Sequence, residues 1–325
     1  LTMSVYTSIS DSEFSEILKS YSLGNFVSAQ GIQAGIENTN YFVTTTKGEF
    51  VFTLFEKINR QQLKLYISLL QELSLAGIHC PQPQYDINKQ TINQIKDKPF
   101  TFVSRLKGKN ITSVNTNHCQ AIATELAKLH TTALSISNSS DKLLQNRRGK
   151  TWREYTAKNL IHRLSSDDAE LVTSEFEHYQ LFDDSKLPKG IIHADLFTDN
   201  ALFEHDQLSG IIDFYDACYD TYLYDIAITI NAWCTNEQGE LVEQLVSGFL
   251  QNYQSIRPLT DAEIKAWPIM LRIAAMRFWL SRLEDSLTQR QGDLTHYKNP
   301  DEYQRILKNH INAHLCCNPL LLSCG

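Results

Sequence analysis

The stretch His193-Ala-Asp-Leu-Phe-Thr-Asp-Asn200, followed by Gly210-Ile-Ile-Asp213, is the part of this sequence that most constrains its fold. The apolar residues 190–192 predict a short buried strand before the first motif, and residues 201–203 predict another after it. Gly210-Ile-Ile predicts a third strand that ends in an acid. The polar residues between these runs predict loops and turns.

Asp195, Asn200 and Asp213 therefore lie at predicted loop or strand ends, where their side chains can converge on one ligand. Phosphoryl transfer needs a carboxylate that orients the attacking hydroxyl and accepts its proton. It also needs Mg²⁺, which prefers oxygen ligands such as those of Asp and Asn. Each residue alone is typical of an ordinary turn. Their combined spacing between apolar strands favours a kinase.

Residue patterns on either side of position 104 differ. Residues 40–46 and 50–55 predict a β-hairpin, and the leucine stripe of 62–76 predicts a helix. Beyond Ser104 most segments show helical periodicity. We expect an α+β chain with two lobes. Residues 1–104 are expected to form a small, sheet-rich N-terminal lobe that binds the nucleotide, and residues 105–325 a larger, mainly helical C-terminal lobe that carries the catalytic and substrate-binding residues.

Composition narrows the class of partner. The 325 residues carry a net charge of -7, which argues against nucleic acid as the main partner. An apolar run of the roughly 18 residues that span a bilayer is missing, so we expect no membrane span. The seven scattered cysteines form no Cys-x-x-Cys pair and are expected to be free thiols in a cytoplasmic protein. The sequence indicates no oligomeric state.

The pattern His193-x-Asp195-x-x-x-x-Asn200, followed by Asp213, resembles the catalytic and metal motifs of the aminoglycoside phosphotransferase and choline kinase superfamily. Ala123-Thr-Glu-Leu-Ala-Lys-Leu-His130 resembles that superfamily's Leu-Ala-x-Leu-His helix. Tyr224-Asp225-Ile-Ala227 resembles the acidic opening of its next helix. The resemblance implies a bilobal, protein-kinase-like fold that binds ATP between the lobes. It implies Asp195 as the catalytic base or the group that orients the hydroxyl, and Asn200 and Asp213 as Mg²⁺ ligands.

A narrower resemblance, to bacterial homoserine kinases, runs from near the N-terminus to the last long predicted helix. It rests on Ser4-Val-Tyr-Thr7, Gly35-Ile-Glu-Asn-Thr-Asn-Tyr-Phe-Val43, His193-Ala-Asp-Leu-Phe197, Ile212-Asp-Phe-Tyr215, Tyr224-Asp-Ile-Ala-Ile-Thr229 and Arg277-Phe-Trp-Leu-Ser-Arg-Leu283. This resemblance implies transfer of the γ-phosphoryl group of ATP to the side-chain hydroxyl of L-homoserine, in threonine biosynthesis.

The resemblance also implies a loop over the phosphates at residues 31–40, for which we name Gly31, Gly35 and Asn38. As a glycine motif this loop is weak. Related kinases carry a phosphate-contacting Lys or Arg on the third strand of the small lobe, where this sequence has Thr53. Lys57 follows that strand and is our candidate to reach back to the phosphates. The alternatives are that another basic residue substitutes for it, or that the site depends more on the metal and on backbone donors.

An amino-acid acceptor needs a cation for its carboxylate and an acid near its ammonium group. Arg277 and Arg282, on one predicted helix, are candidates for the cation, because Arg binds carboxylates in a bidentate manner. Asp216 and Asp220 are candidates for the acid. The alternative for both arginines is a structural ion pair, for example with Glu284 or Asp285.

Two further residues are expected to support the site. His193 could act as a base, but bracing the loop by hydrogen bonds is the better interpretation. Asp225 could hold the catalytic loop, or it could simply be a favourable acid near a helix N-terminus. His130 is expected to be a packed histidine at a helix end.

Two alternatives to a homoserine kinase stay open at this point. One is another small-molecule alcohol kinase of the same fold, acting on choline, an aminoglycoside or a hydroxylated amine. The other is a non-catalytic nucleotide-binding or scaffold protein, which the absence of the small-lobe lysine favours and the presence of Asp195, Asn200 and Asp213 opposes.

Overall fold

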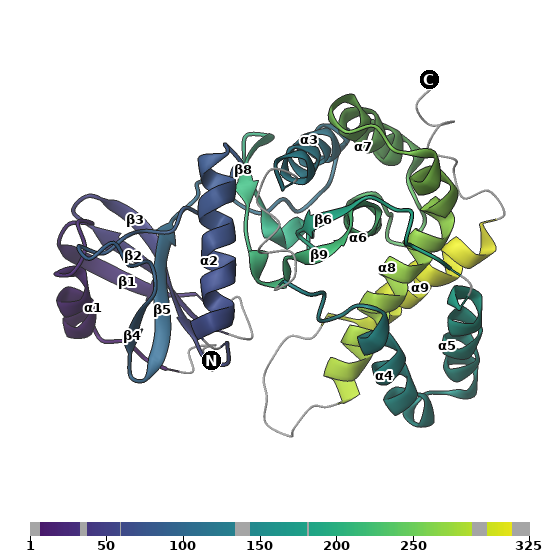
Figure 1. The fold of residues 1–325 in the computed structure, drawn as a ribbon, viewed down its shortest axis with the longest axis horizontal. Helices are drawn as coiled ribbons and strands as arrows, with labels where there is room; N and C mark the ends of the chain where they lie inside the picture. The colour runs from purple at the N-terminus through teal and green to yellow at the C-terminus, as the bar shows by residue number, and fades with distance from the viewer. Residues whose placement is uncertain are drawn as a thin grey trace. The chain divides into compact units, whose positions relative to one another are not determined.

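A computed structural model describes residues 7–32, 38–58, 60–133, 144–180, 182–287 and 298–313 (Figure 1). The helices are α1 (Asp11–Leu18), α2 (Arg60–Leu75), α3 (Thr116–Ala133), α4 (Lys150–Leu160), α5 (Ser166–Tyr179), α6 (Tyr222–Trp233), α7 (Glu243–Ile256), α8 (Asp261–Leu287) and α9 (Pro300–Asn312). The strands are β1 (Phe26–Gly31), β2 (Asn38–Thr45), β3 (Gly48–Phe55), β4 (Asn93–Ile95), β5 (Lys98–Ser104), β6 (Lys189–Ile192), β7 (Ala201–Glu204), β8 (Gln207–Ile211) and β9 (Cys218–Thr221).

The chain divides into two compact units. The first contains residues 1–108 and 209–212, and the second contains residues 109–208 and 213–325. The first is rich in strands and the second is mainly helical, so the predicted fold class is confirmed. The separate functions assigned to segments 1–104 and 105–325 stay predictions.

The first unit is built on an antiparallel sheet with strand order β1-β2-β3-β5-β4. The predicted hairpin is present, and its register pairs Asn38 with Phe55 and Thr45 with Gly48. Helix α1 begins at a capping box in which the Ser10 and Glu13 side chains bond each other's backbone N–H. Its Phe14 lies edge-on to Phe52 of β3, with ring centroids 5.1 Å apart. Aromatic packing therefore fixes α1 on the sheet.

The second unit is organised around α6. Almost every side chain of this helix is buried, which is typical of a helix packed on all sides. Helix α8 packs against both α6 and α9, and α3 packs against α7. Strands β6 and β9 pair in antiparallel register, with Ile192 opposite Cys218. The short β6 strand thus leads directly into the loop that begins at His193.

The described cysteines agree with the expectation of free thiols. Cys80, Cys119, Cys218 and Cys234 are buried and form no disulfide. Cys316, Cys317 and Cys324 lie outside the described residues. Within the segments that the structure describes, no helix combines the length and the apolar character that crossing a membrane requires.

We expect the buried histidine His310 to make the folded protein less stable at acidic pH. Burial, with the charge of Arg272, lowers the pKa of this α9 histidine to about 4. Its Nε2 lies 2.8 Å from Oδ1 of Asn231 on α6. Because the folded-state pKa lies below the unfolded value, stability is lost as pH falls from about 6.5 to about 4.

We expect this histidine to contribute a fall of about 2 kcal/mol in unfolding free energy between pH 7.5 and pH 5. Urea denaturation at both pH values measures the loss. His310→Gln should show a loss smaller by about that amount, since glutamine does not titrate. Equal losses in the two proteins would contradict the assignment.

Candidate active site

The loop that follows β6 is held by a buried carboxylate. Asp225, in the first turn of α6, accepts hydrogen bonds from the backbone N–H groups of His193 and Ala194, both at 2.8 Å. Ala194 has a φ of 64°, a left-handed conformation that disfavours non-glycine residues. The two bonds to Asp225 stabilise this conformation and fix where the next residue, Asp195, leaves the strand.

Asp225 is itself the end of a buried hydrogen-bonded chain. His130 Nε2 lies 3.0 Å from Asp225 Oδ2, and His130 Nδ1 lies 2.6 Å from the Tyr253 hydroxyl. Arg257 donates to that hydroxyl at 3.2 Å. Burial lowers the pKa of His130, so the ring is neutral. We therefore assign Nε2–H as donor to Asp225 and Nδ1 as acceptor from Tyr253.

The ionised state of Asp225 follows from these contacts. Burial alone acts to raise the pKa of Asp225. The hydrogen bonds from His130 and from the N–H of His193 outweigh burial and lower it. A fully buried carboxylate is stable only when such donors surround it. Of its two interpretations, the structure favours the one in which Asp225 holds the catalytic loop.

Other residues hold the rest of the loop. Trp233, at the end of α6, donates from Nε1 to the Leu196 carbonyl at 2.9 Å. The Asn110 amide donates to the carbonyls of Asp199 and Ala201 at 2.7 and 3.1 Å. Asn200 donates to the Asp195 carbonyl at 2.8 Å and to its Oδ2 at 3.2 Å. The structure therefore brings Asp195 and Asn200 into direct contact.

Asp195 presents a partly exposed carboxylate beside a buried arginine. Its side chain is 25% exposed, and its Oδ1 lies 3.6 Å from Arg277 NH1 on α8. Arg277 NH2 lies 4.0 Å from Asp216 Oδ2. Burial raises the pKa of Asp195 to about 7, with Asp216 and Asp213 acting in the same direction and Arg277 and Lys298 against them. We call Asp195, Asp216 and Arg277 the Asp195 cluster.

Asn200 and Asp213 have the chemistry of ligands for a hard cation. Both bonds of Asn200 use its amide nitrogen, which leaves its amide oxygen for another partner. Asp213 is exposed, has a φ of 65° and acts electrostatically on Asp195. Among the described residues no three His, Cys, Asp or Glu side chains gather as a metal cage. Mg²⁺ commonly takes only one or two carboxylates, with water and phosphate oxygens completing its shell.

Three other predicted residues have structural partners. Arg282 binds Glu302 Oε2 at 2.7 Å and the Asn299 carbonyl, and so joins α8 to α9. Asp220 accepts from Asn146 at 2.6 Å and belongs to a different pocket from the Asp195 cluster. Buried His193 accepts a 3.3 Å hydrogen bond from Asp195 N–H, which favours bracing of the loop over a role as base.

The predicted phosphate-contacting residues belong to the first unit. Gly31 ends β1, Asn38 begins β2 and is buried, and Gly35 lies outside the described residues. Thr53 occupies its strand position without a charge and donates to Asn40 at 2.8 Å. Because Asn38 pairs with Phe55, Lys57 lies just beyond the sheet end at which β1 and β2 are connected.

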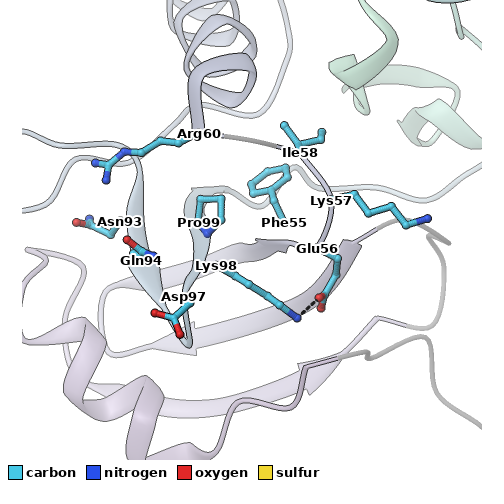
Figure 2. Close-up of a pocket in the computed structure, with 10 residues that line it drawn as sticks. All are labelled: Phe55, Glu56, Lys57, Ile58, Arg60, Asn93, Gln94, Asp97, Lys98 and Pro99. Carbon is cyan, nitrogen blue, oxygen red and sulfur yellow. Dashed lines mark hydrogen bonds and ion pairs between the residues drawn. The ribbon is translucent and has the colours of Figure 1, made fainter.

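Figure 2 shows a pocket of about 290 Å³ at that end of the sheet, lined by Glu56, Lys57, Arg60 and Lys98 among others. Lys98 forms an ion pair with Glu56, whose carboxylate also accepts from Thr39 at 2.8 Å. Lys57 is exposed and points away from this pair. Lys98 is a second basic residue at this end, which the sequence interpretation did not name.

Sequence reasoning also missed Asn110, Trp233 and Tyr253. No short motif could have identified them, because each acts through a partner far along the chain. The motifs that contain His130 and Asp225 can be seen in the sequence, but the hydrogen bond between the two side chains cannot.

Comparison with known proteins assigns the chain to a family. The model of the phosphotransferase enzyme family matches residues 28–259. This chain belongs to that family.

Relatives of this phosphotransferase cover nearly its whole length. It is 43% identical to a homoserine kinase of Methylobacillus flagellatus over 96% of both chains. It is 37% identical to a homoserine kinase of Neisseria meningitidis, over 94% of this chain and 99% of the relative. A solved amicoumacin kinase, in complex with AMP-PNP, Ca²⁺ and Ami, aligns with a TM-score of 0.70 at 16% identity, over 93% and 92% of the two chains. The last match concerns the fold alone.

Removal of the Asp225 carboxylate tests its role in the loop. In Asp225→Ala the N–H groups of His193 and Ala194 lose their acceptor, and His130 loses its partner. We expect the unfolding free energy at neutral pH to fall by about 3 kcal/mol, as for a broken buried pair. Chemical denaturation measures it.

The matched control is Glu16→Ala, which removes an exposed carboxylate on α1 that is paired with Lys19. This control should change stability little. If Asp225→Ala were as stable as the control, the buried chain would not be what holds the loop.

Proposed function

We propose that this phosphotransferase transfers the γ-phosphoryl group of ATP to the side-chain hydroxyl of L-homoserine and releases O-phospho-L-homoserine and ADP. The observation that carries the proposal is Asp195, held in a rigid loop beside Arg277 and Asp216. The 43% identity with a named homoserine kinase supports the choice of acceptor. A shared fold at 16% identity would not support it.

The Asp195 cluster offers one group for each part of the acceptor. Asp195 accepts a hydrogen bond from the side-chain hydroxyl and takes its proton as the oxygen bonds to phosphorus and the bond to ADP breaks. Arg277 binds the carboxylate, and Asp216 binds the ammonium group. Asp216 also lies 3.6 Å from Arg147, which helps to hold it in place. Arg282 and Asp220 have other partners and are left out of this acceptor set.

Asn200 and Asp213 are the proposed Mg²⁺ ligands, through an amide oxygen and a carboxylate. When bound there, Mg²⁺ would neutralise phosphate charge. It would also lower the pKa of Asp195, which is raised to about 7 without it. Asp195 would then be ionised and ready to accept the hydroxyl proton at neutral pH.

An acceptor panel tests the proposed reaction. Purified protein with ATP and Mg²⁺ should form ADP in a coupled assay when L-homoserine is added, and L-homoserine should have the highest kcat/KM in the panel. The panel includes choline, ethanolamine, L-serine and an aminoglycoside. If the protein preferred one of these four compounds, the kinase activity would be supported and the choice of homoserine as acceptor would be refuted. If no compound in the panel caused ADP to form, the proposed kinase activity would be refuted.

Asp195→Asn tests the catalytic base. Asparagine keeps the size and the hydrogen bond acceptor but cannot take a proton, so kcat should fall by about a hundredfold or more. ATP affinity, measured by calorimetry, should change little. Asp199→Asn is the matched control, because Asp199 lies in the same loop but is exposed and paired with Lys298. Full activity in Asp195→Asn would show that another group takes the proton.

A further inference from the structure

A second pocket in the helical unit contains none of the Asp195 cluster. Its volume is about 770 Å³, and its lining comes from α4, α5, the end of β9, the start of α6 and α8. Arg153, Asp220, Thr221, Tyr224, Met270 and Ile273 are the residues on which its chemistry depends. A pocket of this size suits a small molecule.

Two buried hydroxyls in this pocket have no partner. Thr221 and Tyr224 are 1% and 3% exposed, and neither Thr221 Oγ1 nor Tyr224 Oη makes a hydrogen bond within the described part of the chain. Buried polar groups in folded proteins nearly always have partners, because losing water without replacement is costly. Both residues line the pocket, but neither oxygen is accessible from it in this structure, so a ligand can accept from these hydroxyls only when the two side chains turn toward it.

Arg153 lines the same pocket. Its guanidinium carbon is 6.0 Å from the centre of the Tyr224 ring, and no described residue forms an ion pair or hydrogen bond with its side chain. Burial raises the pKa of Tyr224, and the nearby charge of Arg153 acts against that shift. An unpaired guanidinium with five N–H donors is suited to a carboxylate.

The other charges of the pocket limit what kind of anion can bind. Three basic and five acidic side chains line it, so its net charge disfavours a phosphate or a nucleotide. The Asp220 carboxylate accepts from Asn146 and from the Thr221 N–H, and it retains acceptor capacity for an ammonium group. Met270 and Ile273 add an apolar wall. Cation, anion and apolar wall together match a zwitterion with an apolar portion.

We propose that this pocket is a second ligand site that binds a small α-amino acid. Arg153 takes its carboxylate, toward which the Thr221 and Tyr224 side chains turn, Asp220 takes its ammonium group, and the ligand's own side chain packs on Met270 and Ile273. The ligand is not phosphorylated there, because Asp195 does not line the pocket. This site does not depend on which acceptor the enzyme uses.

The pocket adjoins the supports of the Asp195 cluster. Met270, Ile273 and Arg277 follow one another at helical spacing on one face of α8. Tyr224 directly precedes Asp225, which holds the catalytic loop. An amino acid bound in the pocket therefore contacts the same two helices that position Asp195 and Arg277, and its binding can alter the reaction.

Calorimetric titration of the full chain tests the site. The probes are L-serine, L-threonine, L-leucine, L-methionine and L-homoserine, each with its carboxamide, which lacks the carboxylate. At least one free amino acid should bind, and its amide should bind at least about tenfold more weakly. Arg153→Ala should weaken the amino acid by a similar factor. The exposed Arg305→Ala, on α9 outside the pocket, should not.

Thr221→Val and Tyr224→Phe separate ligand binding from folding. Each removes an unpartnered hydroxyl, so the free protein should keep or increase its Tm while affinity for the amino acid falls. The site would be refuted if no probe bound, or if Arg153→Ala left the affinity unchanged. It would also be refuted if that variant raised KM for the acceptor as much as it weakened binding, because the pocket would then be the acceptor site. We expect that KM to change less than about twofold.

Discussion

The buried carboxylate of Asp225 is the constraint on which the proposed active site depends. It sits in the first turn of a helix that is packed on nearly every side, so it cannot move without disturbing the core of the helical unit. Its two oxygens bind consecutive N–H groups of the loop, at His193 and Ala194. These two bonds stabilise the left-handed backbone conformation of Ala194 and determine the direction in which Asp195 projects.

The charge of Asp225 needs support, and a chain of side chains supplies it. Neutral His130 donates to the carboxylate, and Tyr253 and Arg257 continue the chain. A carboxylate without these donors would be protonated or hydrated and would bind the loop poorly. The reverse holds at Asp195, where burial and neighbouring acids raise the pKa to about 7. Two aspartates in one small site therefore differ in protonation, and the proposal uses one as an ionised anchor of the loop and the other as the proton acceptor.

Local sequence patterns predicted the local parts of this structure. Two runs of β-branched and aromatic residues predicted the β2–β3 hairpin, and the five-residue spacing predicted that Asp195 and Asn200 would meet, because both features depend on neighbours in the chain. The partners of His130 are 95 and 123 residues away, and no periodicity encodes such contacts. Arg282 shows the same limit. Its charge fitted an acceptor site, but its partner is Glu302 on the following helix. That Arg153 lacks a charged partner among the described residues was invisible in the sequence, since only a fold shows which charges are paired.

Amide hydrogen exchange of the loop tests most directly whether Asp225 holds it. In the native protein the His193 and Ala194 amides should exchange slowly, at rates close to those of the α6 core. Asp225→Asn replaces one acceptor by a donor, so these two amides should exchange much faster while α3 and α7 keep their protection. If the loop amides were equally protected in both proteins, Asp225 would not hold the loop, and another contact would have to position Asp195.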